Sequence, residues 1–190
     1  MAERNKNMRQ TLVLAGISEI NAHGVTGFSI RRVAEACSVS CAAPYKHFKD
    51  KREFIAAIIE YVNEQWAQRQ PEVLERCGGR LREQIVEVCV SYVEFLMEKP
   101  YFRSILMLKD EEFDNIYHKF RGQLSSRSQQ LEQAFFAASD MDAATQRRKL
   151  STVRALMFGI IFLFDNGELV YNEEAMANLR YNIDREFDLP

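Results

Sequence analysis

The sequence predicts an all-α fold, because apolar residues recur every three or four positions along almost the whole chain and β-branched alternation is scarce. Only four prolines and eight glycines interrupt the 190 residues. Apolar residues make up 47% of the chain and charged residues 27%, which is typical of a protein that buries a core. The longest strongly apolar run, residues 155–164, is far shorter than the roughly 20 residues of a membrane span. No apolar leader segment follows the start, so we expect a soluble, cytoplasmic protein without a membrane partner.

Helix start and stop signals place three short helices in the N-terminal quarter of the chain. The first helix ends near Gly24, a residue suited to a left-handed C-cap. The second begins at Ser29, whose hydroxyl can cap it, and a link at residues 38–39 separates it from the third. The third helix begins at another capping serine, Ser40, and runs to about Phe48. The pattern of a capped helix, a tight turn and a second capped helix indicates a helix-turn-helix.

The remaining helices form a longer second part. A capping-box-like pair, Asp50 and Glu53, starts a fourth helix that is expected to reach Pro71. Apolar stripes then predict helices over residues 81–97, 102–108, 113–138, 153–164 and 176–187. The helix over 81–97 is apolar on two faces, which is typical of a helix inside a bundle.

The distribution of charge also changes near the start of this fourth helix. The formal net charge is only −2, which argues against a protein that is basic throughout. Residues 1–52 nevertheless carry a net +5, and residues 53–190 carry −7. We therefore predict a small polyanion-binding domain over residues 1–52, attached to an acidic helical domain over residues 53–190.

The helix-turn-helix resembles the DNA-binding domain of the TetR family of transcriptional regulators. The resemblance covers residues 10–66 and rests on the string Phe28-Ser29-Ile30-Arg31-Arg32-Val33-Ala34-Glu35-Ala36-Cys37-Ser38-Val39-Ser40, then Ala43-Pro44-Tyr45-Lys46-His47-Phe48, then Lys51 and Phe54. Three departures from the family pattern matter. Ser38 stands where glycine is usual, and Ala42 and Ala43 stand where glycine and threonine are common. Pro44 lies near the fourth position after Ser40, where it removes a helical hydrogen bond, so we expect this helix to begin a residue late or to open locally.

Residue chemistry within this string predicts the DNA contacts. A leading turn of small or polar residues lets the backbone approach base edges in the major groove, and Lys46 can reach a guanine edge or a phosphate. Side chains at helix N-termini favour phosphates. The predicted DNA-binding residues are Ser29, Arg31, Arg32, Ser40, Cys41, Ala42, Ala43, Tyr45, Lys46, His47 and Lys51.

The resemblance also implies that residues 1–52 are a helix-turn-helix DNA-binding domain and that residues 53–190 are a helical ligand-binding and dimerisation domain. It implies a homodimer on a near-palindromic operator and an effector pocket among the middle helices. The predicted dimer interface comprises Leu156, Gly159, Ile160, Leu163, Met176, Leu179 and Ile183. A fully buried helix of a monomer is the alternative for residues 155–164. The predicted ligand-binding residues are Trp66, Tyr92, Phe95, Met107, Phe113, Tyr117, Phe120, Phe158 and Phe162.

Together these observations predict a ligand-responsive transcriptional regulator, most simply a repressor that a small, largely apolar effector releases from its operator. The alternative is a helical small-molecule-binding protein or protein-interaction adaptor without sequence-specific DNA binding. Neither a nucleophilic triad nor a paired-carboxylate or phosphate-loop pattern stands in an activating context, so we expect no enzyme. No cofactor or metal is expected.

Overall fold

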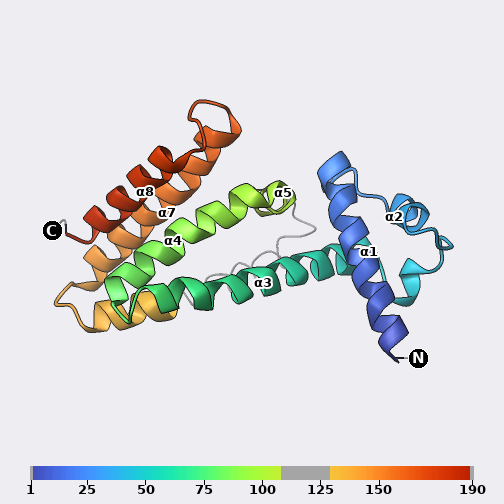
Figure 1. Cartoon of the computed structure of the whole chain (residues 1–190), viewed down its shortest axis with the longest axis horizontal. Coiled ribbons are helices and arrows are strands. Elements are labelled where there is room, and N and C mark those ends of the chain that lie inside the picture. Colours follow the sequence, from blue (N-terminus) through green and yellow to red (C-terminus); the bar gives the residue numbers. More distant parts are fainter. Residues whose placement is uncertain (1, 108–128, 189–190) are drawn as a thin grey trace. The chain divides into compact units, whose positions relative to one another are not determined.

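The computed structural model describes residues 2–107 and 129–188, and every regular element in these ranges is a helix. The elements are α1 (Ala2–His23), α2 (Ile30–Ala36), the 3₁₀ helix η1 (Pro44–Lys46), α3 (Lys51–Arg76), α4 (Leu81–Glu98), α5 (Pro100–Met107), α7 (Ala143–Asp165) and α8 (Glu173–Glu186) (Figure 1). Residues 129–137 are also helical. The all-α prediction is therefore confirmed for the described part of the chain. Among its helices, none has the length and apolar character needed to cross a membrane.

The described residues form two compact units. The first contains the chain up to Gln65 together with α5, and the second contains Trp66–Glu98 together with the described residues after 128. Helix α3 contributes to both units and runs unbroken from Lys51 to Arg76. The domain boundary predicted after residue 52 falls inside this helix and stays a prediction.

In the first unit, α1 packs against α2 and α5 around a small aromatic core. The rings of Phe48 and Phe54 stack with their centroids 4.0 Å apart, and Phe28 meets Phe54 edge-on at 5.3 Å. All three side chains are buried. Helix α1 approaches α3 closely at Gly16, where a Cβ atom would lie 2.8 Å from Cδ1 of Ile58. The aromatic packing and the close approach of α1 to α3 stabilise the helices that carry the helix-turn-helix.

The predicted helix signals are mostly confirmed. Helix α1 ends at His23, and Gly24 follows it with a φ of +68°. The backbone N–H of Glu53 donates to Asp50 at the start of α3, as a capping box requires. Pro71, however, does not end this helix, because the buried side chains of Val73 and Cys77 anchor another turn beyond it.

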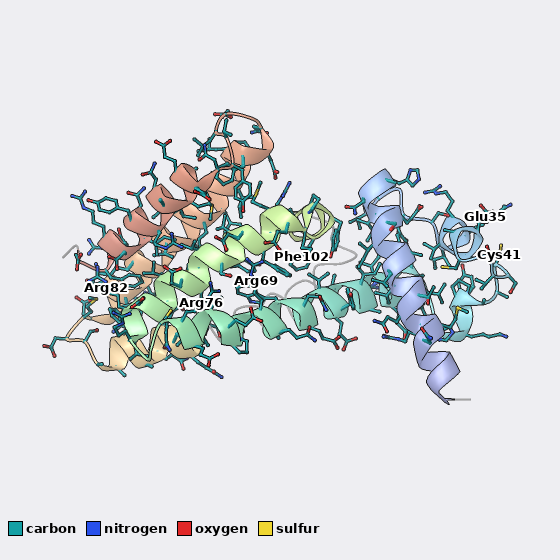
Figure 2. All side chains as sticks on the ribbon, viewed as in Figure 1. Glu35, Cys41, Arg69, Arg76, Arg82 and Phe102 are labelled. Atoms are coloured by element: carbon teal, nitrogen blue, oxygen red, sulfur yellow. The ribbon has the colours of Figure 1, made fainter. Side chains whose placement is uncertain are left out.

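In the second unit, α4 packs against both α7 and α8. Its side chains are buried on two faces, as its pattern predicts, and the buried ones are Ile85, Val86, Val88, Cys89, Val90, Ser91, Val93, Phe95 and Leu96. Ion pairs tie the C-terminal end of the chain to α4: Arg82, labelled in Figure 2, pairs with Asp184 of α8 at 2.7 Å and with Asp188, just after α8, at 2.5 Å. Arg180 of α8 pairs with Glu87 of α4 at 2.5 Å. These bonds fix how α8 lies along the bundle.

Candidate functional site

The predicted helix-turn-helix forms in the first unit. Ser29 caps α2, since its side-chain oxygen accepts the backbone N–H of Arg32 at 3.4 Å. After α2 the chain turns at Ser38, whose φ of +55° is left-handed. The turn is closed by two 3.0 Å hydrogen bonds, from the N–H of Ser38 to Glu35 O and from the N–H of Val39 to Ala34 O. A serine thus occupies a conformation that glycine adopts at lower cost.

The recognition segment differs from the prediction of a capped α-helix over residues 40–48. Only Pro44–Lys46 is regular, as the 3₁₀ helix η1, and its cap residue Ala43 makes no side-chain hydrogen bond. The carbonyl of Ser40 accepts the N–H of Ala43 at 2.8 Å, which forms a single turn. Pro44 has no N–H to continue an α-helical ladder from Ser40, so the segment tightens instead.

The surface of this segment matches the requirements of a nucleic-acid contact. Of the predicted contact residues, Ser40, Cys41, Ala42, Tyr45 and Lys46 are exposed, while Ala43 and His47 are half-buried. Tyr45 keeps 57% of its surface accessible, which is high for an aromatic residue. Figure 2 shows Glu35 on α2 and Cys41 on the turn that follows it.

Two exposed cations beside this segment are absent from the predicted set. Lys49 and Arg52 flank the cap of α3, and within the described residues neither they nor Lys46 forms an ion pair. The signal in the sequence is their position on either side of Asp50, between the recognition segment and α3. Unpaired cations on one surface are what a phosphate backbone attracts.

Arg32 and Lys51, two predicted phosphate ligands, are already engaged. Arg32 donates both Nε, at 2.8 Å, and Nη2 to Glu19 of α1, and Nη2 also donates to the carbonyl of Gly27 at 2.5 Å. Lys51 donates to the carbonyl of Thr26 at 3.2 Å. In the described structure these side chains therefore tie α2 and α3 to α1 and to the loop that follows it. Their contacts with phosphate stay predictions.

Glu19 is the buried partner in this network, with only 8% of its surface exposed. Burial alone would raise the pKa of its carboxyl, but bonds from the Arg32 guanidinium and from the N–H of Ser29 at 3.1 Å lower it overall. Arg31, the preceding residue of α2, is exposed and pairs with Glu35 at 3.1 Å. The charge available to a phosphate from α2 is therefore that of Arg31, partly offset by Glu35.

Three of the predicted ligand residues come together in the second unit. Trp66 lies 5.1 Å from Tyr92 and 5.4 Å from Phe95, measured between ring centroids. Trp66 is 2% exposed, and its indole N–H has no hydrogen-bond partner in the described structure. Asn63, one turn earlier on α3, likewise buries its side-chain amide without a partner, and the sequence alone did not single it out. Orphaned buried donors of this kind call for a physical explanation.

Two other predicted ligand residues, Phe158 and Phe162, are not part of this cluster. Phe158 and Phe162 lie on α7 and are 43% and 55% exposed, unlike residues of an enclosed pocket. Phe113, Tyr117 and Phe120 lie outside the described residues, and Met107 is the last residue of α5.

The predicted dimer residues divide by exposure. On α8, Met176, Leu179 and Ile183 are buried within the protomer, where contact with α4 and α7 already accounts for their apolar character. On α7, Leu156, Ile160 and Leu163 are half-buried and Gly159 is exposed. A single chain does not test whether any of them meets a partner.

Comparison with known proteins agrees with this geometry. Residues 12–58, which span the helix-turn-helix, match the family of bacterial regulatory proteins named tetR. The whole chain resembles a solved TetR family transcription regulator from Marinobacter aquaeolei VT8, with 19% identity, a TM-score of 0.72 and 98% of each chain covered. A proposed fatty acid metabolism regulator from Clostridium perfringens is also similar, with 16% identity, a TM-score of 0.69, and 93% of this chain and 97% of that one covered. No curated protein matches the chain in sequence.

Proposed function

The chain belongs to the TetR family of transcriptional regulators, and from that premise we propose that it is a repressor whose homodimer leaves its operator when a small effector binds. The family is one of DNA-binding regulators rather than enzymes. The observation that carries the proposal is the exposed, cationic recognition segment, which follows the capped helix α2 and a hydrogen-bonded turn. We place its action in the cytoplasm, where bacterial DNA is accessible.

We propose that residues 40–47 enter the major groove. The exposed small residues Ser40, Cys41 and Ala42 permit close approach of the backbone to base edges, and Tyr45 and Lys46 extend beyond them. Phosphates on either side are within the expected reach of Lys49 and Arg52, while Arg32 and Lys51 orient the helices through their internal bonds.

The exposed face of α7 supports a homodimer. Phe158 and Phe162 lie one turn apart and expose large apolar surfaces beside Gly159. Glycine inside a helix costs about 1 kcal/mol relative to alanine, and a Cβ at Gly159 would meet nothing within 4 Å in the protomer. A partner helix that packs closely on this face explains both features.

The aromatic cluster around Trp66 supports an effector that is largely apolar and carries one hydrogen-bond acceptor. Its rings provide flat apolar surfaces, and the unpaired indole N–H would be satisfied by a carbonyl or carboxylate oxygen. The similarity to a proposed regulator of fatty acid metabolism is consistent with an effector of this class.

Selection from randomised DNA with the purified protein tests the main claim. We expect enrichment of a near-palindromic sequence, and the absence of any enriched sequence would favour the alternative of a protein-interaction adaptor. Lys46→Ala should weaken binding and reduce the slope of log affinity against log salt by about 1 per protomer. Arg147→Ala removes an exposed cation from the second unit and serves as the matched control, which should leave the slope unchanged.

A further inference from the structure

A cavity of about 490 Å³ lies in the second unit between the helix over residues 129–137 and α7. It shares no residue with the aromatic cluster around Trp66. Its volume lies in the range of small-molecule sites. Phe136 and Leu150 contribute apolar lining, and Gln133 and Gln146 contribute amides.

Two opposite charges line the same cavity without pairing. Glu132 comes from the helix over 129–137, and Arg154 comes from α7. Within the described residues neither side chain forms an ion pair or a hydrogen bond, so their charged groups lie too far apart to neutralise each other directly. Glu132 is half-buried, and burial raises the pKa of its carboxyl, an effect that Arg154 opposes. An unpaired carboxylate that is partly removed from water is costly unless a cation or donor joins it.

The charge of both groups also acts on the protein interior. The thiol of Cys89 on α4 is buried, and its pKa is raised to about 12, chiefly by burial and further by the charge of Glu132, while Arg154 opposes the rise.

We propose that the cavity binds a small zwitterion of the amino-acid type, with its ammonium on Glu132, its carboxylate on Arg154 and an apolar side chain against Phe136 and Leu150. Each charge of such a ligand finds its opposite, and the planar guanidinium suits a carboxylate. Gln146 already donates Nε2 to the carbonyl of Met141 at 2.7 Å, which leaves its amide oxygen to accept from the ammonium. A neutral apolar ligand would leave the carboxylate of Glu132 unsatisfied and is disfavoured.

Isothermal titration calorimetry of the full chain with each of the twenty standard amino acids, in the absence of DNA, tests the proposal. We expect at least one with an apolar side chain to bind with a Kd of about 1 mM or tighter. The N-acetyl and carboxamide derivatives of that amino acid each lack one charge and should bind at least about tenfold more weakly.

Matched variants assign the binding to this cavity. Glu132→Gln should weaken binding of the intact amino acid and abolish the penalty for N-acetylation, and Arg154→Gln should do the same for the carboxamide. Arg147→Gln, an exposed arginine of α7 outside the cavity lining, should bind as the wild type does. Retained helical circular dichroism and operator binding show that each variant is folded.

Failure to detect binding of any of the twenty amino acids would overturn the proposal, as would binding that both cavity variants leave unchanged. Either result would leave the proposed regulation intact, because DNA selection is measured separately. Conversely, amino-acid binding by a protein that selects no DNA sequence would support the cavity and refute the regulatory function.

Discussion

Ser38 occupies a backbone conformation that its side chain disfavours, so replacing it with glycine should stabilise the DNA-binding unit. Its φ of +55° costs a residue with a Cβ about 1–2 kcal/mol. Glycine avoids that cost. It also loses more conformational entropy on folding than serine does, and this loss offsets about 0.5–1 kcal/mol of the gain. We therefore expect Ser38→Gly to raise the free energy of unfolding by about 0.5–1 kcal/mol.

No compensating interaction is lost in this substitution. The bonds that close the turn are donated by the backbone N–H groups of Ser38 and Val39, which glycine preserves. Within the described residues the hydroxyl of Ser38 makes no hydrogen bond, and the side chain is exposed. The turn therefore keeps its geometry, and operator affinity should not fall.

Urea unfolding followed by circular dichroism measures the effect. With an m-value of about 2 kcal/mol/M, the midpoint should rise by about 0.3–0.5 M. Two control substitutions separate backbone conformation from a general effect of glycine. Ser18→Gly, in the regular part of α1, should destabilise by about 0.5 kcal/mol. Gly24→Ala, at a φ of +68° with open space around it, should destabilise by about 1–2 kcal/mol.

The reasoning would be refuted if Ser38→Gly lowered the midpoint as Ser18→Gly does. A raised midpoint together with lost operator binding would show instead that the strained turn is required for recognition. Either result is distinguishable from an unfolded variant, because the far-ultraviolet spectrum at zero urea reports helix content directly.

Three further substitutions test other parts of the structure. Glu19→Gln should lower the free energy of unfolding by about 2 kcal/mol at neutral pH, since it removes a charged partner of Arg32. The pKa of Glu19 in the folded protein is lowered from 4.5, so its contribution to stability is complete above pH 4.5 and is lost as the pH falls through the folded pKa. The urea midpoints of the wild type and the variant should therefore converge in acid. A constant difference between the midpoints would contradict the assignment. Gly16→Ala should destabilise by about 1–2 kcal/mol in thermal unfolding, because its Cβ would overlap the buried Ile58, and an unchanged Tm would show that α1 and α3 can separate. Gly159→Ala should shift sedimentation equilibrium toward monomer while raising protomer stability by about 1 kcal/mol, and undiminished dimerisation would remove this face from the interface.

Local chemistry was sufficient to predict many details of the first unit. The cap at Ser29, the left-handed turn at Ser38, the end of α1 before Gly24 and the cap of α3 by Asp50 all depend on residues within a few positions of each other. Such signals operate through backbone hydrogen bonds and φ preferences that neighbouring residues decide. The same short range explains the match of a helix-turn-helix pattern to this part of the chain.

At Pro71 and Pro44 the helix bounds predicted from neighbouring residues differ from those of the structure. Pro71 predicts the end of a helix, but buried residues beyond it keep α3 helical. Pro44 has no N–H for an α-helical hydrogen bond, and the chain forms a 3₁₀ turn there instead. The regular part of the recognition segment is therefore shorter than its pattern predicts. Burial of side chains beyond the proline accounts for the first case, and the missing N–H of Pro44 itself accounts for the second.

The composition and spacing of the chain were enough to establish an all-α fold with a helix-turn-helix in a basic N-terminal part, because helical periodicity, caps and charge are written in adjacent residues. Tertiary contacts decided which cationic side chains remain available to bind phosphate. Arg32 looks like a free cation in the sequence but is held by Glu19, thirteen residues away, whereas Lys49 and Arg52 form no ion pair with the residues that the structure describes. The cavity between Glu132 and Arg154 likewise depends on how two successive helices, residues 129–137 and α7, lie in space, since the two residues are 22 positions apart in the chain. A residue's partners depend on distances in space, which no local pattern encodes.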